Sequence, residues 1–161
     1  MIALNLTDAK KCMSQLLLSN TFDAFYFIEG EIVTFNTFTF DGFLQRGFFE
    51  EAPPSEYSLW KDLRDFCFQL IKGKRTPLSF KFVFRLSPEN TARLLTQSGI
   101  PLKPEDVQGL YLNIRYNGSE LQCITGTSVK VFTLDKTLEQ TWDNTVQKFF
   151  QAHEIQCEPI Q

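Results

Sequence analysis

The sequence contains a single histidine, no C-x-x-C pair and no long run of apolar residues. Because His153 has no second histidine to pair with and lies at the end of the last predicted helix, we expect it to be an exposed residue and no metal site to form around it. No stretch approaches eighteen apolar residues, which excludes a membrane-spanning helix, and Met1–Asn5 lacks the start of a signal peptide. We therefore expect a cytoplasmic protein that does not bind membranes.

Paired cysteine spacing and an excess of basic charge are also missing. The four cysteines are scattered, and three of them stand among apolar residues, so we expect small core side chains in a reducing compartment. These residues are Cys12, Cys67, Cys123 and Cys157. The net charge of -3 and the isoelectric point near 5.2 argue against broad, nonspecific affinity for nucleic acid.

Cofactor motifs are absent as well. Gly73-Lys74 resembles the end of a phosphate-binding loop, but Phe68 stands where that motif needs a glycine and Arg75 follows the lysine. Glu29, Glu31 and Asp41 could bind a cation or act in acid-base chemistry, yet exposed carboxylates beside a hairpin turn are the better interpretation. We expect no cofactor and no metal.

The composition and the spacing of apolar residues predict one α+β domain. With 161 residues, 43% of them apolar, the chain is long enough to bury a core, and seventeen phenylalanines give that core an aromatic character. Spacing by twos predicts two or three antiparallel strands in Phe22–Gly42, a strand in Pro77–Leu86, one ending at Tyr116, and two more in Leu121–Leu134. Helical spacing predicts helices after Thr7, over Leu59–Ile71, after Ser87-Pro88, and after Asp135.

The second half of the chain repeats the pattern of the first. Leu4–Asp8 is a short apolar alternation that ends in a helix cap, and Phe84–Pro88 has the same pattern eighty positions later. We predict an internally duplicated β-α-β(3)-α unit, with pseudo-repeats over about 1–76 and 77–152 and a tail over 153–161. The two units would form a curved, mostly antiparallel sheet with helices on one face; a clamp-like duplicated domain or a two-layer sandwich are the alternatives.

Two resemblances accompany this pattern. The element order is similar to that of the TATA-binding-protein-like fold, a likeness that covers no functional residue. Four segments, Tyr57–Trp60, Leu70–Phe82, Leu112–Tyr116 and Phe132–Asp135, resemble an uncharacterised bacterial family of about this length, known only as a domain of unknown function. The resemblance implies a single-domain cytoplasmic protein and supplies no catalytic residue.

A basic group is the first candidate site. Lys and Arg residues precede and line one face of the predicted strand after Pro77, and a second strand carries Tyr, Asn and Arg on a like face. If these strands are neighbours, the sheet presents a basic face with an aromatic residue, which suits single-stranded nucleic acid or another polyanion; a merely solvated face is the alternative that we favour. The residues are Lys72, Lys74, Arg75, Lys81, Arg85, Tyr111, Asn113 and Arg115.

The weakly patterned stretch Leu44–Glu56 and its flank give the second candidate. We expect at most an edge strand there, and the aromatic and arginine residues Phe43, Arg46, Phe48 and Phe49 either form a protein interface or pack beneath the loop as a small separate core. The sequence therefore favours a binding or scaffolding module that self-associates, for example as a homodimer joined at a sheet edge. Polyanion binding is the alternative, and an enzyme with an unrecognised carboxylate site is a second one.

Overall fold

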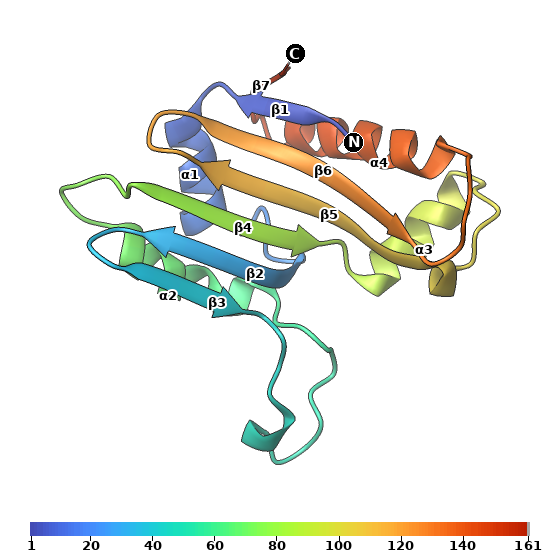
Figure 1. The fold of residues 1–161 in the computed structure, drawn as a ribbon, viewed down its shortest axis with the longest axis horizontal. Coiled ribbons are helices and arrows are strands. Elements are labelled where there is room, and N and C mark those ends of the chain that lie inside the picture. The colour runs from blue at the N-terminus through green and yellow to red at the C-terminus, as the bar shows by residue number, and fades with distance from the viewer. Residues whose placement is uncertain (161) are drawn as a thin grey trace.

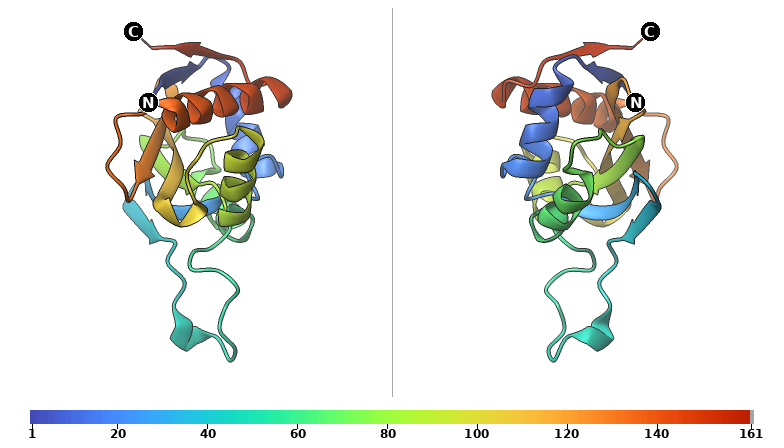
Figure 2. Two further views of the ribbon diagram at one scale, coloured as in Figure 1. Left: turned by 90° about the vertical axis from the view of Figure 1, so that its right-hand side faces the viewer. Right: turned by 90° about the vertical axis from the view of Figure 1, so that its left-hand side faces the viewer.

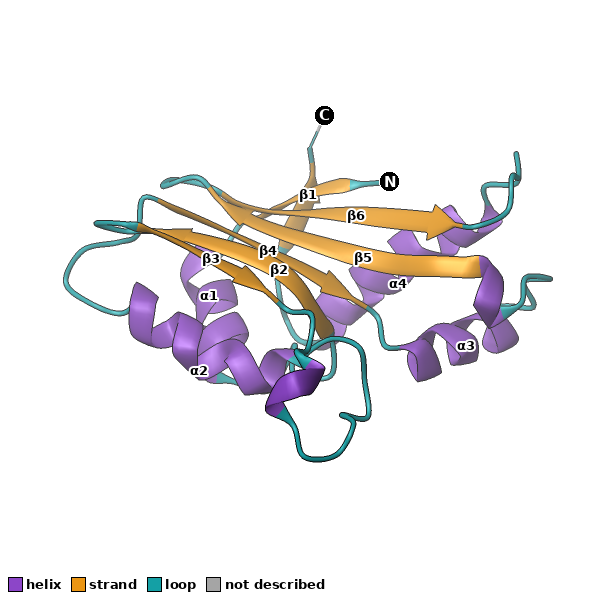
Figure 3. Ribbon diagram, turned by 60° about the horizontal axis from the view of Figure 1, so that its bottom comes forward, coloured by secondary structure: helices purple, strands orange, loops and turns teal. Residues whose placement is uncertain are grey.

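The alternating apolar residues form a seven-stranded antiparallel sheet in the computed structural model, which describes residues 1–160 (Figure 1). The strands are β1 (Ala3–Leu6), β2 (Tyr26–Val33), β3 (Thr37–Asp41), β4 (Ser79–Arg85), β5 (Val107–Tyr116), β6 (Leu121–Val129) and β7 (Cys157–Pro159). The α-helices are α1 (Ala9–Leu18), α2 (Trp60–Ile71), α3 (Pro88–Gln97) and α4 (Thr137–Ala152), and the 3-10 turns are η1 (Arg46–Phe48) and η2 (Pro104–Asp106). The helices lie on one face of an open, curved sheet, which confirms the predicted α+β class (Figure 3).

The strand order is β3-β2-β4-β5-β6-β1-β7. Both halves of the chain have the element order β-α-β-β-α, so each half contains one strand fewer than predicted after its first helix. The first strand, β1, pairs with β6 of the second half, and β4 lies between the hairpins β2–β3 and β5–β6. The internal duplication and the likeness to the TATA-binding-protein-like fold remain predictions.

Three sequence predictions about strands need correction. Leu121–Leu134 was expected to hold two strands around Gly126, but that glycine lies inside β6 opposite Tyr111, where a side chain would make only an ordinary contact with the Tyr111 Cβ atom. Residues 44–56 form no edge strand. The expected tail 153–161 contains β7, which pairs with β1; Gln161 lies outside the described residues.

The core lies between the sheet and the helices and is built from aromatic rings. Phe80, Phe82 and Phe84 on β4 all point into it and are almost completely buried. The indole of Trp60, in the first turn of α2, lies 5.0 Å from the rings of both Phe82 and Phe84, measured between centroids. Its Nε1 donates a hydrogen bond to the carbonyl of Leu16 at 2.9 Å, so one side chain joins α1, α2 and the sheet.

The helix boundaries follow the predicted signals with small shifts. Ser87 caps α3 by accepting a hydrogen bond from the Asn90 backbone, as expected. At α1 the cap is Asp8 and not Thr7, because the Asp8 carboxylate accepts from the Lys11 backbone. None of the helices described within residues 1–160 is both long and apolar enough to cross a membrane.

A long excursion leaves the sheet between β3 and α2. We call residues 43–57 the arm. Its base is a short ladder in which Phe43 pairs with Tyr57 and the Leu44 backbone donates to Glu56, and η1 forms its tip. Figures 1 and 2 show the arm projecting beyond β3, away from the body of the protein.

Candidate functional site

The predicted basic group falls into two places in the structure. The face of the sheet that no helix covers, which we call the open face, carries the part of the group that lies on strands. The two strands are neighbours, as the basic-face hypothesis required: in the register of β4 and β5, Lys81 is opposite Arg115 and Arg85 is opposite Tyr111. Asn113 lies between these two pairs, opposite Val83.

Of the predicted basic residues on the open face, Lys81 and Arg115 are exposed. Arg85 is half-buried, with its guanidinium carbon 5.4 Å from the ring centre of Tyr26 and 5.1 Å from that of Tyr57. The Arg85 guanidinium therefore makes cation–π contacts with two tyrosine rings, which leaves it less available to bind a phosphate group. Burial, helped by the charge of Glu89, raises the pKa of Tyr26, although the charge of Arg85 opposes this.

Tyr111 lies over the backbone of its own strand. A Cβ placed on Gly109 would come within 2.5 Å of the Tyr111 Cζ atom, so the tyrosine ring fills the space that the glycine leaves free. The neighbouring Asn113 donates from Nδ2 to the Ile124 carbonyl at 3.3 Å. The predicted aromatic and amide groups are thus present on the open face, but they make contacts within the protein.

Acidic side chains share this face. Glu31 is the partner of Lys81 on the other side of β4, and Glu29 is opposite Asp41 on β3. No cluster of three or more metal-ligating side chains occurs among residues 1–160. Of the three carboxylates that we considered for a cation, Glu31 is thus the direct neighbour of a basic residue, Lys81, and partly offsets its charge.

Lys72, Lys74 and Arg75 lie apart from the open face, in the loop between α2 and β4. This loop and the β2–β3 turn enclose a hollow of about 630 Å³, which we call the end hollow. Its apolar lining includes Phe35, which is 86% exposed and makes an edge-to-face contact with Phe38 at 5.9 Å, and the exposed Leu78. Sequence reasoning recognised the basic loop but missed its aromatic partners, because Phe35 fitted the strand pattern of Phe22–Gly42.

The arm carries all four residues of the predicted interface. Phe48 is 87% exposed, and Phe43, Arg46 and Phe49 are exposed as well. Phe48 and Phe49 contact each other edge to face at 5.7 Å, and Phe43 contacts Tyr57 in the same way. The alternative of a small separate core beneath the loop is wrong for Phe48, which packs against no part of the body.

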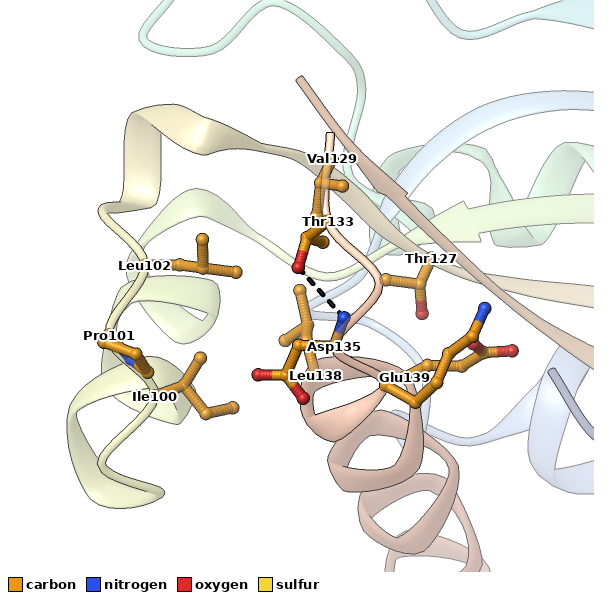
Figure 4. A pocket seen from close by; sticks show the side chains of 10 residues that line it. Ile100, Pro101, Leu102, Thr127, Val129, Thr133, Asp135, Leu138 and Glu139 are labelled. Atoms are coloured by element: carbon orange, nitrogen blue, oxygen red, sulfur yellow. Dashed lines mark hydrogen bonds and ion pairs between the residues drawn. The ribbon is translucent and has the colours of Figure 1, made fainter. Parts of the chain in front are cut away.

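Another hollow, of about 260 Å³, lies between the α3–β5 connection and the start of α4 (Figure 4). Both of its carboxylates are tied to neighbours: Asp135 accepts from the backbone and hydroxyl of Thr137, and Glu139 pairs with the amino group of Met1. These hydrogen bonds lower the pKa of both carboxyl groups. A lowered pKa suits a structural carboxylate and not a general acid working near neutral pH.

Comparison with known proteins identifies a family without assigning a role. The model described as "Family of unknown function (DUF5721)" matches residues 15–158, nearly the whole chain. No curated protein and no solved structure matches the sequence. The resemblance to a domain-of-unknown-function family is thereby confirmed, and the chain belongs to the family of unknown function DUF5721.

Proposed function

We propose that this protein is a cytoplasmic binding or scaffolding module, working without a cofactor, and that the arm is the element that contacts its protein partner. The observation that carries the proposal is the exposure of Phe48 on a segment that projects from the body (Figure 2). Phenylalanine and arginine are among the residues that interfaces concentrate, and here Phe43, Arg46, Phe48 and Phe49 stand within seven positions.

The energetics of the arm support the same role. Ordering a residue costs roughly 1–2 kcal/mol in backbone entropy, and folding normally offsets this cost by burying apolar surface. The turn η1 at the tip of the arm contains no buried residue. A bound protein that covers the two phenylalanines would supply the missing burial, at roughly 1.5–3 kcal/mol for each fully covered ring.

Photo-crosslinking tests the proposal directly. A benzophenone amino acid replaces Phe48 in cells, and the same replacement is made at Phe132, which is 92% exposed in the loop between β6 and α4 and serves as the matched control. We expect one dominant protein adduct, identified by mass spectrometry, from position 48 and none from position 132. Equal, diffuse labelling from both positions would reject the arm as a binding element.

Polyanion binding on the open face is the second candidate function. It is favoured by the adjacency of Lys81 and Arg115, neither of which forms an ion pair within residues 1–160. Against it stand the neighbouring carboxylates and the engagement of Arg85 by two tyrosines.

Fluorescence anisotropy with labelled single-stranded DNA and RNA separates this candidate from the first. Polyanion binding would be salt-dependent and would weaken in Lys81→Glu/Arg115→Glu. The control Lys10→Glu/Lys148→Glu makes the same change in net charge on α1 and α4, away from the open face. Equal affinity of both variants would exclude the open face as the site.

A further inference from the structure

We infer that the partner of the arm is a second copy of this chain: two copies pair their β3 edges antiparallel about a two-fold axis, and the arm of each reaches the end hollow of the other. The inference rests on the proposed function, since it identifies what the arm binds. Three independent features support it, namely the free edge at β3, the direction of the arm, and the opposite charges of arm and hollow.

The two edges of the sheet differ in how they are protected. At one edge, β7 is three residues long and contains Pro159, which cannot donate a backbone hydrogen bond. At the other edge, β3 has the sequence Thr-Phe-Thr-Phe-Asp and pairs only with β2. It has no lysine, proline or bulge, and its first charged residue is Asp41 at the very end. An unprotected edge of this kind is a template for pairing with another strand.

The arm and the end hollow lie at opposite ends of β3. The chain enters β3 from the β2–β3 turn, which lines the end hollow, and it leaves β3 into the arm. Figure 1 shows the arm leaving the end of β3 and projecting beyond the outer edge of the sheet, on the side where a second copy would pair. In an antiparallel pair about a two-fold axis, the arm end of one β3 meets the hollow end of the other, so both arms point at hollows at once.

The lengths are compatible with this arrangement. A five-residue strand such as β3 spans about 17 Å at the usual rise per residue. One leg of the arm, from Phe43 to the end of η1, spans about 16 Å, because three of its residues form a 3-10 turn with a short rise per residue. The tip of the arm can therefore reach past the turn that precedes the partner's β3.

The charges of the two surfaces are complementary. The arm contains Glu50, Glu51 and Glu56 against one base, Arg46, whereas the end hollow offers three bases. None of the three glutamates and none of Lys72, Lys74 and Arg75 forms an ion pair within the part of the chain that the structure describes. Phe48 and Phe49 bring aromatic surface to a hollow that already exposes Phe35 and Leu78, so apolar and charged groups both match.

A charge-swap experiment tests the inference with the full chain. Sedimentation equilibrium gives the mass and the dimer dissociation constant of the wild type, of Glu50→Lys/Glu51→Lys and of Lys74→Glu/Arg75→Glu. Each variant alone places like charges at both contacts of its dimer, and we expect dissociation constants on the order of tenfold higher than that of the wild type. All four positions are exposed, so circular dichroism and thermal unfolding should show an unchanged fold.

An equimolar mixture of the two variants provides the decisive result. In the mixed dimer, one contact has the natural charges and the other has both charges reversed, so both contacts are attractive and association should return to near the wild-type strength. A wild-type dimer whose affinity neither variant lowers, or a mixture that does not recover, would overturn the geometry. A wild type that is monomeric at all concentrations would overturn self-association. In that case, a Phe48 crosslink to a different protein would preserve the proposed function of the arm. If that crosslink is absent as well, both the self-association and the proposed function are rejected.

Discussion

At the residue scale, Trp60 connects more of the core than any other side chain described above. Its ring packs on Phe82 and Phe84 while its Nε1 satisfies the Leu16 carbonyl at the end of α1. A phenylalanine at this position would keep much of the packing but leave that carbonyl without its donor.

We predict that Trp60→Phe lowers the free energy of unfolding by about 2–3 kcal/mol, from the unpaired buried carbonyl and the lost ring volume. Urea unfolding measures the change. Phe132→Ala, at an exposed position, is the control and should alter stability by no more than about 0.5 kcal/mol. Equal losses in the two variants would show that the indole hydrogen bond has no structural role.

Gly109 gives a second prediction at this scale, because its missing side chain makes room for the ring of Tyr111. Gly109→Ala should change the free energy of unfolding by no more than about 1 kcal/mol, since the half-exposed tyrosine ring must move toward solvent while the strand loses a flexible glycine. In a Tyr111→Ala background the same change should be more favourable to folding, and a double-mutant cycle by urea unfolding measures the difference. Additive effects would mean that Tyr111 does not occupy this space in solution.

The buried thiols predict how stability depends on pH. Burial is the main cause that raises the pKa of Cys12 and of Cys67 to about 12, from an ordinary thiol value near 9. Between about pH 9 and 12 the unfolded chain loses these protons while the folded chain keeps them, so the thiols favour folding below pH 9 and stability falls above it. One thiol contributes at most about 1.4 kcal/mol per pH unit to this fall.

Cys67→Ala isolates that contribution from other groups that titrate in alkali. The free energy of unfolding, measured in urea at pH 7.5, 9 and 10, should fall less steeply with pH in the variant than in the wild type. Parallel pH profiles for the two proteins would contradict the burial of this thiol.

At the scale of elements, the arm differs from the rest of the chain because it adds exposed aromatic surface without contributing to the core. We predict that replacing residues 45–55 by a short glycine-containing turn changes the free energy of unfolding by no more than about 1 kcal/mol, because loop length has a weak entropic effect. The same replacement should abolish the crosslink and the self-association described above.

Thermal unfolding and sedimentation of this shortened variant make the comparison. The backbone pairings at the base of the arm, Phe43 with Tyr57 and Leu44 with Glu56, are retained, so β3 and α2 keep their connection. A large loss of stability would show that the arm is part of the folding core, and unchanged self-association would show that it is not part of the interface.

The sequence predicted those elements whose pattern is local. The helix Leu59–Ile71 and the alternating strand after Pro77 agree with α2 and β4, because amphipathic spacing reports directly which face is buried. Gly126 looks like a turn in a single sequence, but its pairing with Tyr111 of β5 keeps it inside β6. The pairing of β7 with β1 connects the two ends of the chain, and no local pattern reports it.

The candidate sites show the same limit. Charge and aromatic content identified Lys81, Arg115 and the arm phenylalanines, but the rings around Arg85 come from Tyr26 and Tyr57, which are distant in sequence. Phe35 and Leu78 likewise lie beside the basic loop only because the β2–β3 turn and the α2–β4 loop are at the same end of the sheet. These contacts depend on strand order, which the sequence left open.

At the scale of the whole molecule, the protein has a covered face, an open face, one protected edge and one unprotected edge. The arm begins at the unprotected edge, and the end hollow lies at the far end of the same strand. This arrangement places every feature that we assign to self-association along β3 and its flanks, and leaves the helix-covered face to stability.

Amide hydrogen exchange of the full chain, measured at low and at high protein concentration, tests this account most directly. The amides of Thr37–Asp41 that do not bond to β2 face solvent in a single copy and should exchange rapidly at low concentration. At high concentration we predict that these amides and those of the arm become protected together, while the open face does not change. Rapid exchange of β3 and the arm at concentrations where the protein is dimeric, or protection confined to the open face, would contradict the account.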